Sequence, residues 1–116
     1  GDEKRDLLRS ASIFVFTPNE PEGHPWVLVE ASAHSLPIIA TNQGAIVENV
    51  IHNLNGFIVG TNSPKEIKDR LLELKDIKLR DAMGSASHKI YTKKFTEKEM
   101  IDGLKNAIYS TLNHRD

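Results

Sequence analysis

Two glutamates at the ends of one apolar stretch, Glu22 and Glu30, have the residue type and spacing for ligand chemistry. The stretch between them, GHPWVLV, reads as a loop that runs into a helix, because Pro25 suits the first helical turn. Glu22 then lies in the loop, and Glu30 lies about 7–8 Å along the helix axis. The amides of the first turn stand between the two carboxylates and favour an anion such as phosphate. A ligand with a central diphosphate and a hydroxyl-bearing group at each end fits this spacing.

The alternative interpretation gives neither glutamate a ligand, with Glu22 a solvated loop residue and Glu30 paired with a lysine. For Glu30 the character of the helix argues against it. The neighbouring side chains, among them Trp26, Val27 and Leu28, are apolar nearly all round, which predicts a buried helix. A carboxylate on a buried helix is costly unless hydrogen-bond donors satisfy it. We therefore expect a ligand at Glu30.

Short apolar runs alternate with helical stretches along the chain. Strands are predicted over 12–18, 36–41 and 57–59, and helices over 2–11, 24–35, 62–75, 79–94 and 97–112, with a turn and a short helix within 42–51. Ser63 and Thr96 are expected to cap the helices that follow them. This alternation is typical of a parallel sheet covered on both faces, so the fold class is α/β with a Rossmann-like sheet. A doubly wound sheet normally has about five or six strands. Residues 1–116 are therefore interpreted as a single partial domain, half of such a fold.

The composition excludes several classes of protein. The 15 basic and 16 acidic side chains leave a net charge of −1, which argues against a nucleic-acid-binding protein with a broad basic face. Without cysteine, neither a disulfide framework nor a thiolate metal site is expected, and a reducing cytoplasm fits. No apolar run approaches the roughly 20 residues of a membrane-spanning helix. The histidines, at positions 24, 34, 52, 88 and 114, match no compact metal-site spacing, so no metal is expected.

Apolar side chains in the second half of the chain are predicted to serve two roles. Those expected in the core are Leu71, Leu72, Leu74, Ile77 and Leu79. Those expected to form one stripe of the last helix are Met100, Ile101, Leu104, Ile108 and Leu112. We expect part of this stripe to be exposed.

The segment EGHPWVLVEASAHSLPIIAT, residues 22–41, resembles the paired-glutamate motif of the retaining glycosyltransferases of the GT-B fold, the large family four. The likeness continues through EKRDLLRSASIFVFTP before the motif and NQGAIVENVIHNLNGFIVGTNSPKEIKDRLLEL after it. The closing stretch MGSASHKIYTKKFTEKEMIDGLKNAIYSTL also resembles the last helices of that family. The resemblance covers nearly the whole chain and identifies it as the C-terminal part of a nucleotide-sugar-binding domain.

The resemblance implies transfer of a sugar from a nucleotide-diphosphate-sugar to an acceptor, with retention at the anomeric carbon. Glu22 is the implied catalytic residue, which contacts the donor sugar and steadies positive charge at the anomeric carbon. The implied donor-binding residues are Gly23, His24, Trp26, Val27 and Glu30. Of these, Glu30 holds the ribose hydroxyls, and the amides of Trp26 and Val27 approach the diphosphate. His24 stands where the family usually has an aromatic residue.

The resemblance also implies partners that this chain does not carry. The family has an N-terminal acceptor domain, and an arginine and a lysine ahead of the matching segment neutralise the leaving diphosphate. Because such charge stabilisation is a large part of catalysis, we expect the chain alone to be inactive. The implied enzyme needs no metal or other cofactor and contacts no nucleic acid. The implied enzyme works in the cytoplasm, and peripheral contact with the membrane is compatible with this implied function. Polysaccharide assembly is a typical setting for the family.

Two other interpretations remain open at this stage. A stand-alone nucleotide-sugar-binding or protein-interaction module would keep the fold without the catalysis. A different GT-B enzyme, such as a nucleotide-sugar epimerase or a phosphorylase, would share the architecture, although the paired glutamates followed by LPIIAT fit the transferases better. The nucleotide base, the donor sugar and the acceptor are left open by the sequence.

Overall fold

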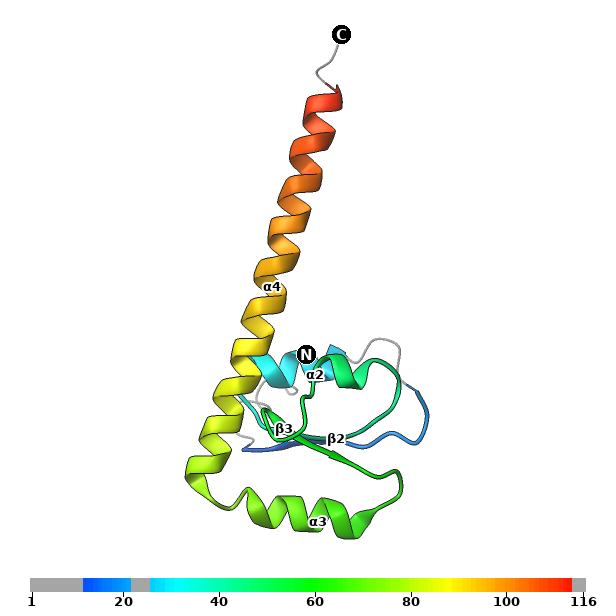
Figure 1. The fold of residues 1–116 in the computed structure, drawn as a ribbon, viewed down its shortest axis with the longest axis vertical. Helices are drawn as coiled ribbons and strands as arrows, with labels where there is room; N and C mark the ends of the chain where they lie inside the picture. The colour runs from blue at the N-terminus through cyan, green and yellow to red at the C-terminus, as the bar shows by residue number, and fades with distance from the viewer. Residues whose placement is uncertain (1–11, 22–25, 114–116) are drawn as a thin grey trace, which may run out of the picture.

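The protein is built on a three-stranded parallel sheet with strand order β1-β2-β3 (Figure 1). The computed structural model describes residues 12–21 and 26–113, with side chains as far as residue 106. The strands are β1 (Phe14–Phe16), β2 (Ile38–Thr41) and β3 (Gly56–Val59). Val15 pairs with Ile39 and Ile39 with Phe57, which makes β2 the central strand. The predicted parallel α/β sheet is therefore confirmed.

Helices cover both faces of this sheet. They are α2 (Trp26–Ala33), the 3-10 helix η1 (Gly44–Glu48), α3 (Pro64–Glu73) and α4 (Ile77–Asn113). In Figure 1, α2 and α3 lie on opposite faces of the sheet, and α4 runs past the end of the sheet and projects well beyond it. The predicted helix over 2–11 lies outside the described residues.

The alternation of side chains along β2 divides the core in two. Ile38 and Ala40 pack with Leu28 of α2 and Ile46 of η1 on one face. On the other face, Ile39 packs with a group from β3 and the helices after it, namely Phe57, Val59, Leu74 and Met83. All four residues of β2 are buried, as a central strand of a parallel sheet should be.

The helix α2 ends in a Schellman motif, the common C-terminal cap in which one residue takes a left-handed conformation. The Leu36 N–H donates to the Ala31 carbonyl at 3.1 Å, and the Ser35 N–H donates to the Ser32 carbonyl at 3.0 Å. Ser35 has φ 59°, a value that glycine adopts more readily. This cap turns the chain directly from α2 into β2.

A buried asparagine holds the loop between η1 and β3. The side chain of Asn55 accepts from the Ile51 N–H at 2.7 Å and donates to the Asn49 carbonyl at 2.9 Å. The Asn55 carbonyl in turn accepts from the Ile38 N–H and from the hydroxyl of Ser87 on α4. This loop is thus fastened both to the sheet and to α4.

The prediction of two separate helices over 79–94 and 97–112 was wrong. One continuous helix, α4, runs from Ile77 to Asn113, and Thr96 lies inside it rather than at a cap. The stretch KKFTEKE around Thr96 contains neither glycine nor proline, and a helix interior tolerates threonine at a cost of less than about 1 kcal/mol. The predicted cap of α3 is at Ser63, but its hydroxyl does not bond the helix amides.

Several predictions of burial were also wrong. Leu74 is buried and Leu79 packs against the core, but Leu71, Leu72 and Ile77 are exposed. Leu71 and Leu72 are exposed because α3 covers the narrow sheet with one face only, whereas Ile77 is the first residue of α4. The expected exposure of the last helical stripe is confirmed at Met100, Ile101 and Leu104. Ile108 and Leu112 lie beyond the side chains that the structure describes.

Candidate functional site

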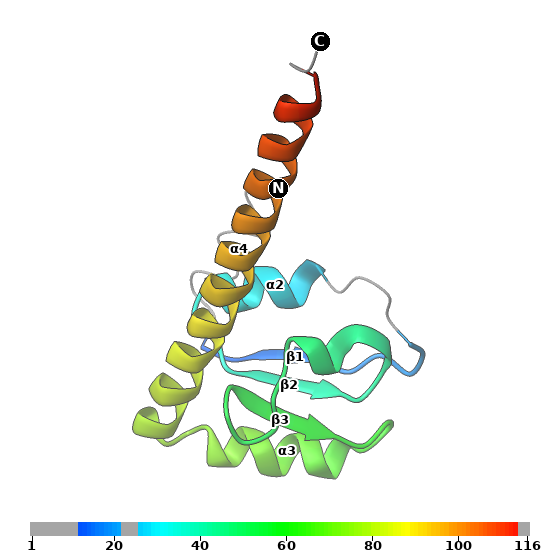
Figure 2. The same cartoon turned by 45° about the horizontal axis from the view of Figure 1, so that its top comes forward.

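The helix α2 starts at the edge of the sheet where the three parallel strands end. Figure 2 shows the arrowheads of β2 and β3, the helix η1 and the first turn of α2 on the same side of the molecule. In parallel α/β folds this carboxyl edge is where ligands bind. The partial positive charge at the start of α2 faces the same edge, which favours an anion there.

Three of the predicted site residues lie on α2, and the other predicted site residues are not among those that the structure describes. Trp26, Val27 and Glu30 lie in the first turns of α2. Glu22, Gly23 and His24 are not among the described residues, so their predicted roles stay predictions.

The helix α2 is less buried than its apolar sequence suggested. The side chain of Trp26 is 67% exposed, while Val27 and Glu30 are half-buried and Leu28 is fully buried. The helix therefore packs only one face against the sheet. Because Glu30 is half-buried, its carboxylate does not bear the full cost of desolvation.

Two further hydrogen bonds hold the loops at this edge, and no sequence motif marks them. The fully buried hydroxyl of Thr41, at the end of β2, donates to the Pro18 carbonyl at 2.8 Å. The amide of Gln43 donates to the hydroxyl of Thr61 at 3.1 Å. These bonds link the segments after β1, β2 and β3 to one another.

The loop after β3 is held by a carboxylate. The Gly60 N–H donates to Glu66 of α3 at 2.6 Å. This bond, and a second one from the Ser63 hydroxyl, lower the pKa of Glu66 below its ordinary value. Since Ser63 and Glu66 have the spacing of a capping box, a bond from Glu66 back to the Ser63 N–H would be the usual arrangement. Here the carboxylate instead reaches past the helix start and fixes the strand end.

Two of the histidines that the structure describes form local hydrogen bonds. The Nδ1 atom of His34 lies 2.8 Å from the Glu30 carbonyl at the end of α2, and the Ile58 N–H donates to Nδ1 of His52 at 2.9 Å. Within 12–21 and 26–113, no three His, Asp or Glu side chains gather as a metal site would require.

Comparison with known families decides the relationship of the chain. The profile of the family described as glycosyl transferases group 1 matches residues 1–90. The chain belongs to this family.

Curated relatives agree with this membership. The chain is 34% identical over 113 residues to an uncharacterised glycosyltransferase of Methanocaldococcus jannaschii, covering 97% of this chain and 31% of that protein. It is 32% identical over 106 residues to the capsular polysaccharide biosynthesis glycosyltransferase CapM of Staphylococcus aureus, covering 90% of this chain and 27% of that protein. The chain thus spans about a third of the length of the relatives that it matches.

Solved structures share the fold. The C-terminal domain of the group 1 glycosyl transferase LpcC of Francisella tularensis superposes with a TM-score of 0.72 at 29% identity, over 82% of this chain and 49% of that one. HepE of Anabaena, solved in complex with UDP, superposes with a TM-score of 0.78 at 22% identity, over 90% of this chain and 29% of that one. The α/β fold of the chain is therefore that of the C-terminal domain of GT-B glycosyltransferases.

None of the helices in the part of the chain that the structure describes is both long enough and apolar enough to span a membrane.

Proposed function

We propose that this chain is the C-terminal portion of the donor domain of a retaining glycosyltransferase, and that it binds the nucleotide-diphosphate of a sugar donor. The observation that carries the proposal is the position of α2. Its first turn and the half-buried Glu30 lie at the carboxyl edge of a parallel sheet, within a family whose members transfer sugars.

The roles within this site follow the order of the residues along α2. Glu30 accepts hydrogen bonds from the ribose hydroxyls, because a carboxylate can accept from two neighbouring hydroxyls at once. The amides of Trp26 and Val27 approach the diphosphate, whose negative charge the start of the helix favours. Ahead of α2, Gly23 and His24 contact the donor. Glu22 acts at the anomeric carbon, where it stabilises positive charge in the transition state and the configuration is retained.

The donor is bound without a metal or other cofactor, and the nucleotide to test first is UDP. HepE, which shares this fold, was solved with UDP and with UDP-glucose. A mannosyltransferase of Mycobacterium tuberculosis, 39% identical over 72 residues, is described as GDP-mannose-dependent. UDP and GDP are therefore compared side by side.

An NMR titration tests the site and uses the isotopically labelled 116-residue chain. UDP or GDP at millimolar concentration is expected to shift the amide resonances of Trp26 to Glu30. In the Glu30→Gln variant the apparent Kd should rise about tenfold, because hydrogen bonds to a charged group contribute about 1.5–3 kcal/mol. Glu99→Gln, an exposed change on α4, is the matched control and should leave the Kd unchanged.

Amide shifts confined to regions away from α2, or equal affinities of the Glu30→Gln and control variants, would contradict the donor site. We expect no sugar transfer by the 116-residue chain itself, since the relatives with this activity are about three times longer. Transfer by the isolated chain would overturn this expectation. Binding of a nucleotide by the chain, with no transfer by any longer protein that contains it, would favour the stand-alone binding module instead.

A further inference from the structure

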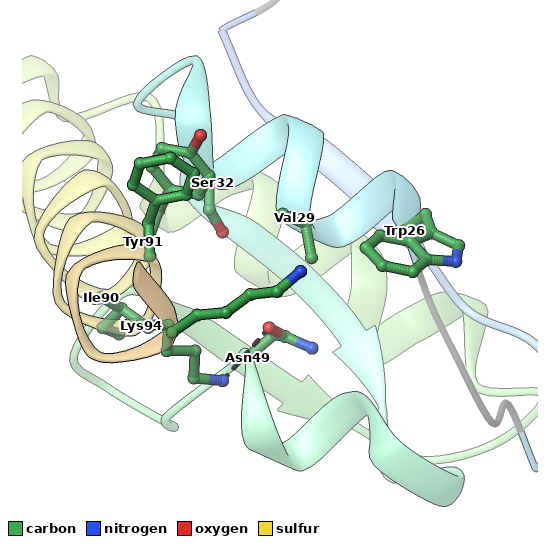
Figure 3. A pocket seen from close by; sticks show the side chains of 9 residues that line it. Trp26, Val29, Ser32, Asn49, Ile90, Tyr91 and Lys94 are labelled. Atoms are coloured by element: carbon green, nitrogen blue, oxygen red, sulfur yellow. Dashed lines mark hydrogen bonds between the residues drawn. The ribbon is translucent and has the colours of Figure 1, made fainter. Parts of the chain in front are cut away.

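A cavity of about 360 Å³ lies between α2, the end of η1 and the middle of α4 (Figure 3). We call it the α2–α4 cavity. Its volume is within the range of small-molecule sites, about 300–1,000 Å³. It lies along the flank of α2 that faces α4, and Glu30 is not among the residues that line it.

Aromatic rings form much of the wall of this cavity. Trp26 lines it from the start of α2, and Tyr91 and Phe95 line it from α4. The rings of Tyr91 and Phe95 stack with centroids 6.0 Å apart, and half of the Phe95 side chain is exposed. These rings offer apolar surface that a ligand can remove from water.

A buried hydroxyl also faces the α2–α4 cavity without a protein partner. Ser32 is 3% exposed, and its Oγ atom forms no hydrogen bond within the described part of the chain. Figure 3 shows this hydroxyl directed from α2 toward the space in front of α4. A buried polar atom is costly when it has no partner, so a ligand that bonds Ser32 gains that free energy.

The charge at the α2–α4 cavity is positive. Lys94 and Lys98 are among the residues that line it, and none of the lining residues is acidic. Lys94 already donates to the Glu48 carbonyl and to Asn49, at 3.2 Å for the latter, which fastens α4 to η1. Lys98, one turn further along α4, is an exposed ammonium group at the same cavity.

We propose that the α2–α4 cavity binds an amphiphilic anion. Its apolar body lies against the rings of Trp26, Tyr91 and Phe95, a polar atom bonds the Ser32 hydroxyl, and one phosphate group pairs with Lys98. A single-chain lipid phosphate and a small aryl phosphate share this chemistry. The site goes beyond sugar transfer and stands whether or not the chain binds a nucleotide.

Fluorescence of Trp26, the single tryptophan of the chain, reports on binding at the start of α2, and the Lys98 and Ser32 variants assign the signal to the α2–α4 cavity. The 116-residue chain is titrated with decyl phosphate below its critical micelle concentration and with phenyl phosphate. We expect a saturable blue shift, because the ligand covers an indole that is now two-thirds exposed. Binding of decyl phosphate alone assigns a lipid source, and binding of phenyl phosphate alone assigns an aryl source.

Variants distinguish binding at this cavity from non-specific binding to the chain. Lys98→Glu should weaken binding about tenfold or more through loss of the charged partner, and Ser32→Ala about fivefold through loss of one hydrogen bond. Lys65→Glu, the same charge change at an exposed position of α3, should have no effect. Lys98 is exposed, so its replacement leaves the fold intact, which the NMR spectrum of the variant verifies.

Three results would overturn the proposal. The first is no saturable shift with either phosphate. The second is an equal shift with decanol, which has the apolar chain without the charge. The third is equal affinity of the Lys98→Glu and Lys65→Glu variants.

Discussion

The hydroxyl of Thr41 donates a hydrogen bond of 2.8 Å to the carbonyl of Pro18, and so joins the ends of two neighbouring parallel strands. Thr41 is the last residue of β2, and Pro18 lies just after β1, at the start of the segment that leads to α2. Thr41 is fully buried, so its hydroxyl is shielded from water. The bond therefore fixes where the chain leaves β1 at the proposed donor site.

Replacement of Thr41 by valine removes the hydroxyl and keeps the shape of the side chain. We expect a loss of about 1–2 kcal/mol in the free energy of unfolding, because the Pro18 carbonyl loses its donor. In NMR spectra the Pro18 carbonyl resonance and the Asn19 amide should shift in Thr41→Val and return toward their original positions in Thr41→Ser. Equal shifts in the two variants would show that the hydroxyl is not the group that matters.

The sheet could be predicted from the sequence because each strand is a short apolar run between turn residues. The runs around Phe14, Ile38 and Phe57 have no helical periodicity and are too short for helices, so a buried parallel sheet was the consistent interpretation. The continuity of α4 could not be predicted in the same way. A threonine followed by acidic residues is a signal for a helix start, and only packing decides whether a helix begins there or passes through.

The candidate site could be predicted only in part. Pro25 indicated that the stretch between Glu22 and Glu30 runs from a loop into a helix, and the structure places Glu30 and Trp26 on that helix. The predicted burial of α2 was too high. Apolar residues on all sides of a helix do not reveal how many neighbouring elements pack against it. The bond from Thr41 to Pro18 joins residues far apart in sequence, and no local pattern marks such a contact.

Replacement of Ser35 by glycine should stabilise the protein. Ser35 has φ 59° in the cap of α2, and a left-handed conformation costs a non-glycine residue about 1–2 kcal/mol. The greater freedom of glycine in the unfolded chain offsets about 0.4–1 kcal/mol of that gain. A net increase of about 0.5–1 kcal/mol is expected in urea unfolding.

Ser85→Gly is the control for this change, since Ser85 is an exposed residue inside α4. There glycine should lower the stability by about half a kcal/mol, because it is the poorer helix former. The same sign of effect at positions 35 and 85 would contradict the strained cap.

The carboxylate of Glu66 should make stability depend on pH on the acid side. Its pKa is lowered in the folded chain, first by the bond from the Gly60 N–H and then by that from the Ser63 hydroxyl. A group whose pKa falls on folding stabilises the protein above its unfolded pKa, and this contribution is lost as the pH falls through the folded pKa. Urea unfolding between about pH 6 and pH 3 should therefore show a weaker loss of stability in Glu66→Gln than in the original chain.

At neutral pH the Glu66→Gln variant should be the less stable of the two, because it lacks the charged acceptor for the Gly60 N–H. Glu99→Gln on the exposed face of α4 controls for the removal of one carboxylate. If Glu66→Gln and Glu99→Gln change the pH dependence equally, then the bond to Gly60 does not fix the strand end.

Two glycines of this chain should respond in opposite ways to replacement by alanine. A Cβ atom at Gly56 would lie 1.7 Å from the backbone carbonyl oxygen of Ile38, its partner across β2 and β3. Backbone cannot move aside as a flexible side chain can, so Gly56→Ala should cost about 3 kcal/mol or more. At Gly103 of α4 nothing lies within 4 Å, and alanine there should add up to about 1 kcal/mol of stability through its helix propensity. Urea unfolding of both variants measures the difference. A tolerated alanine at position 56 would mean that β3 does not pair with β2 in this register. The arrangement of the carboxyl edge, with α2 and the loop of Gly60, would then be wrong.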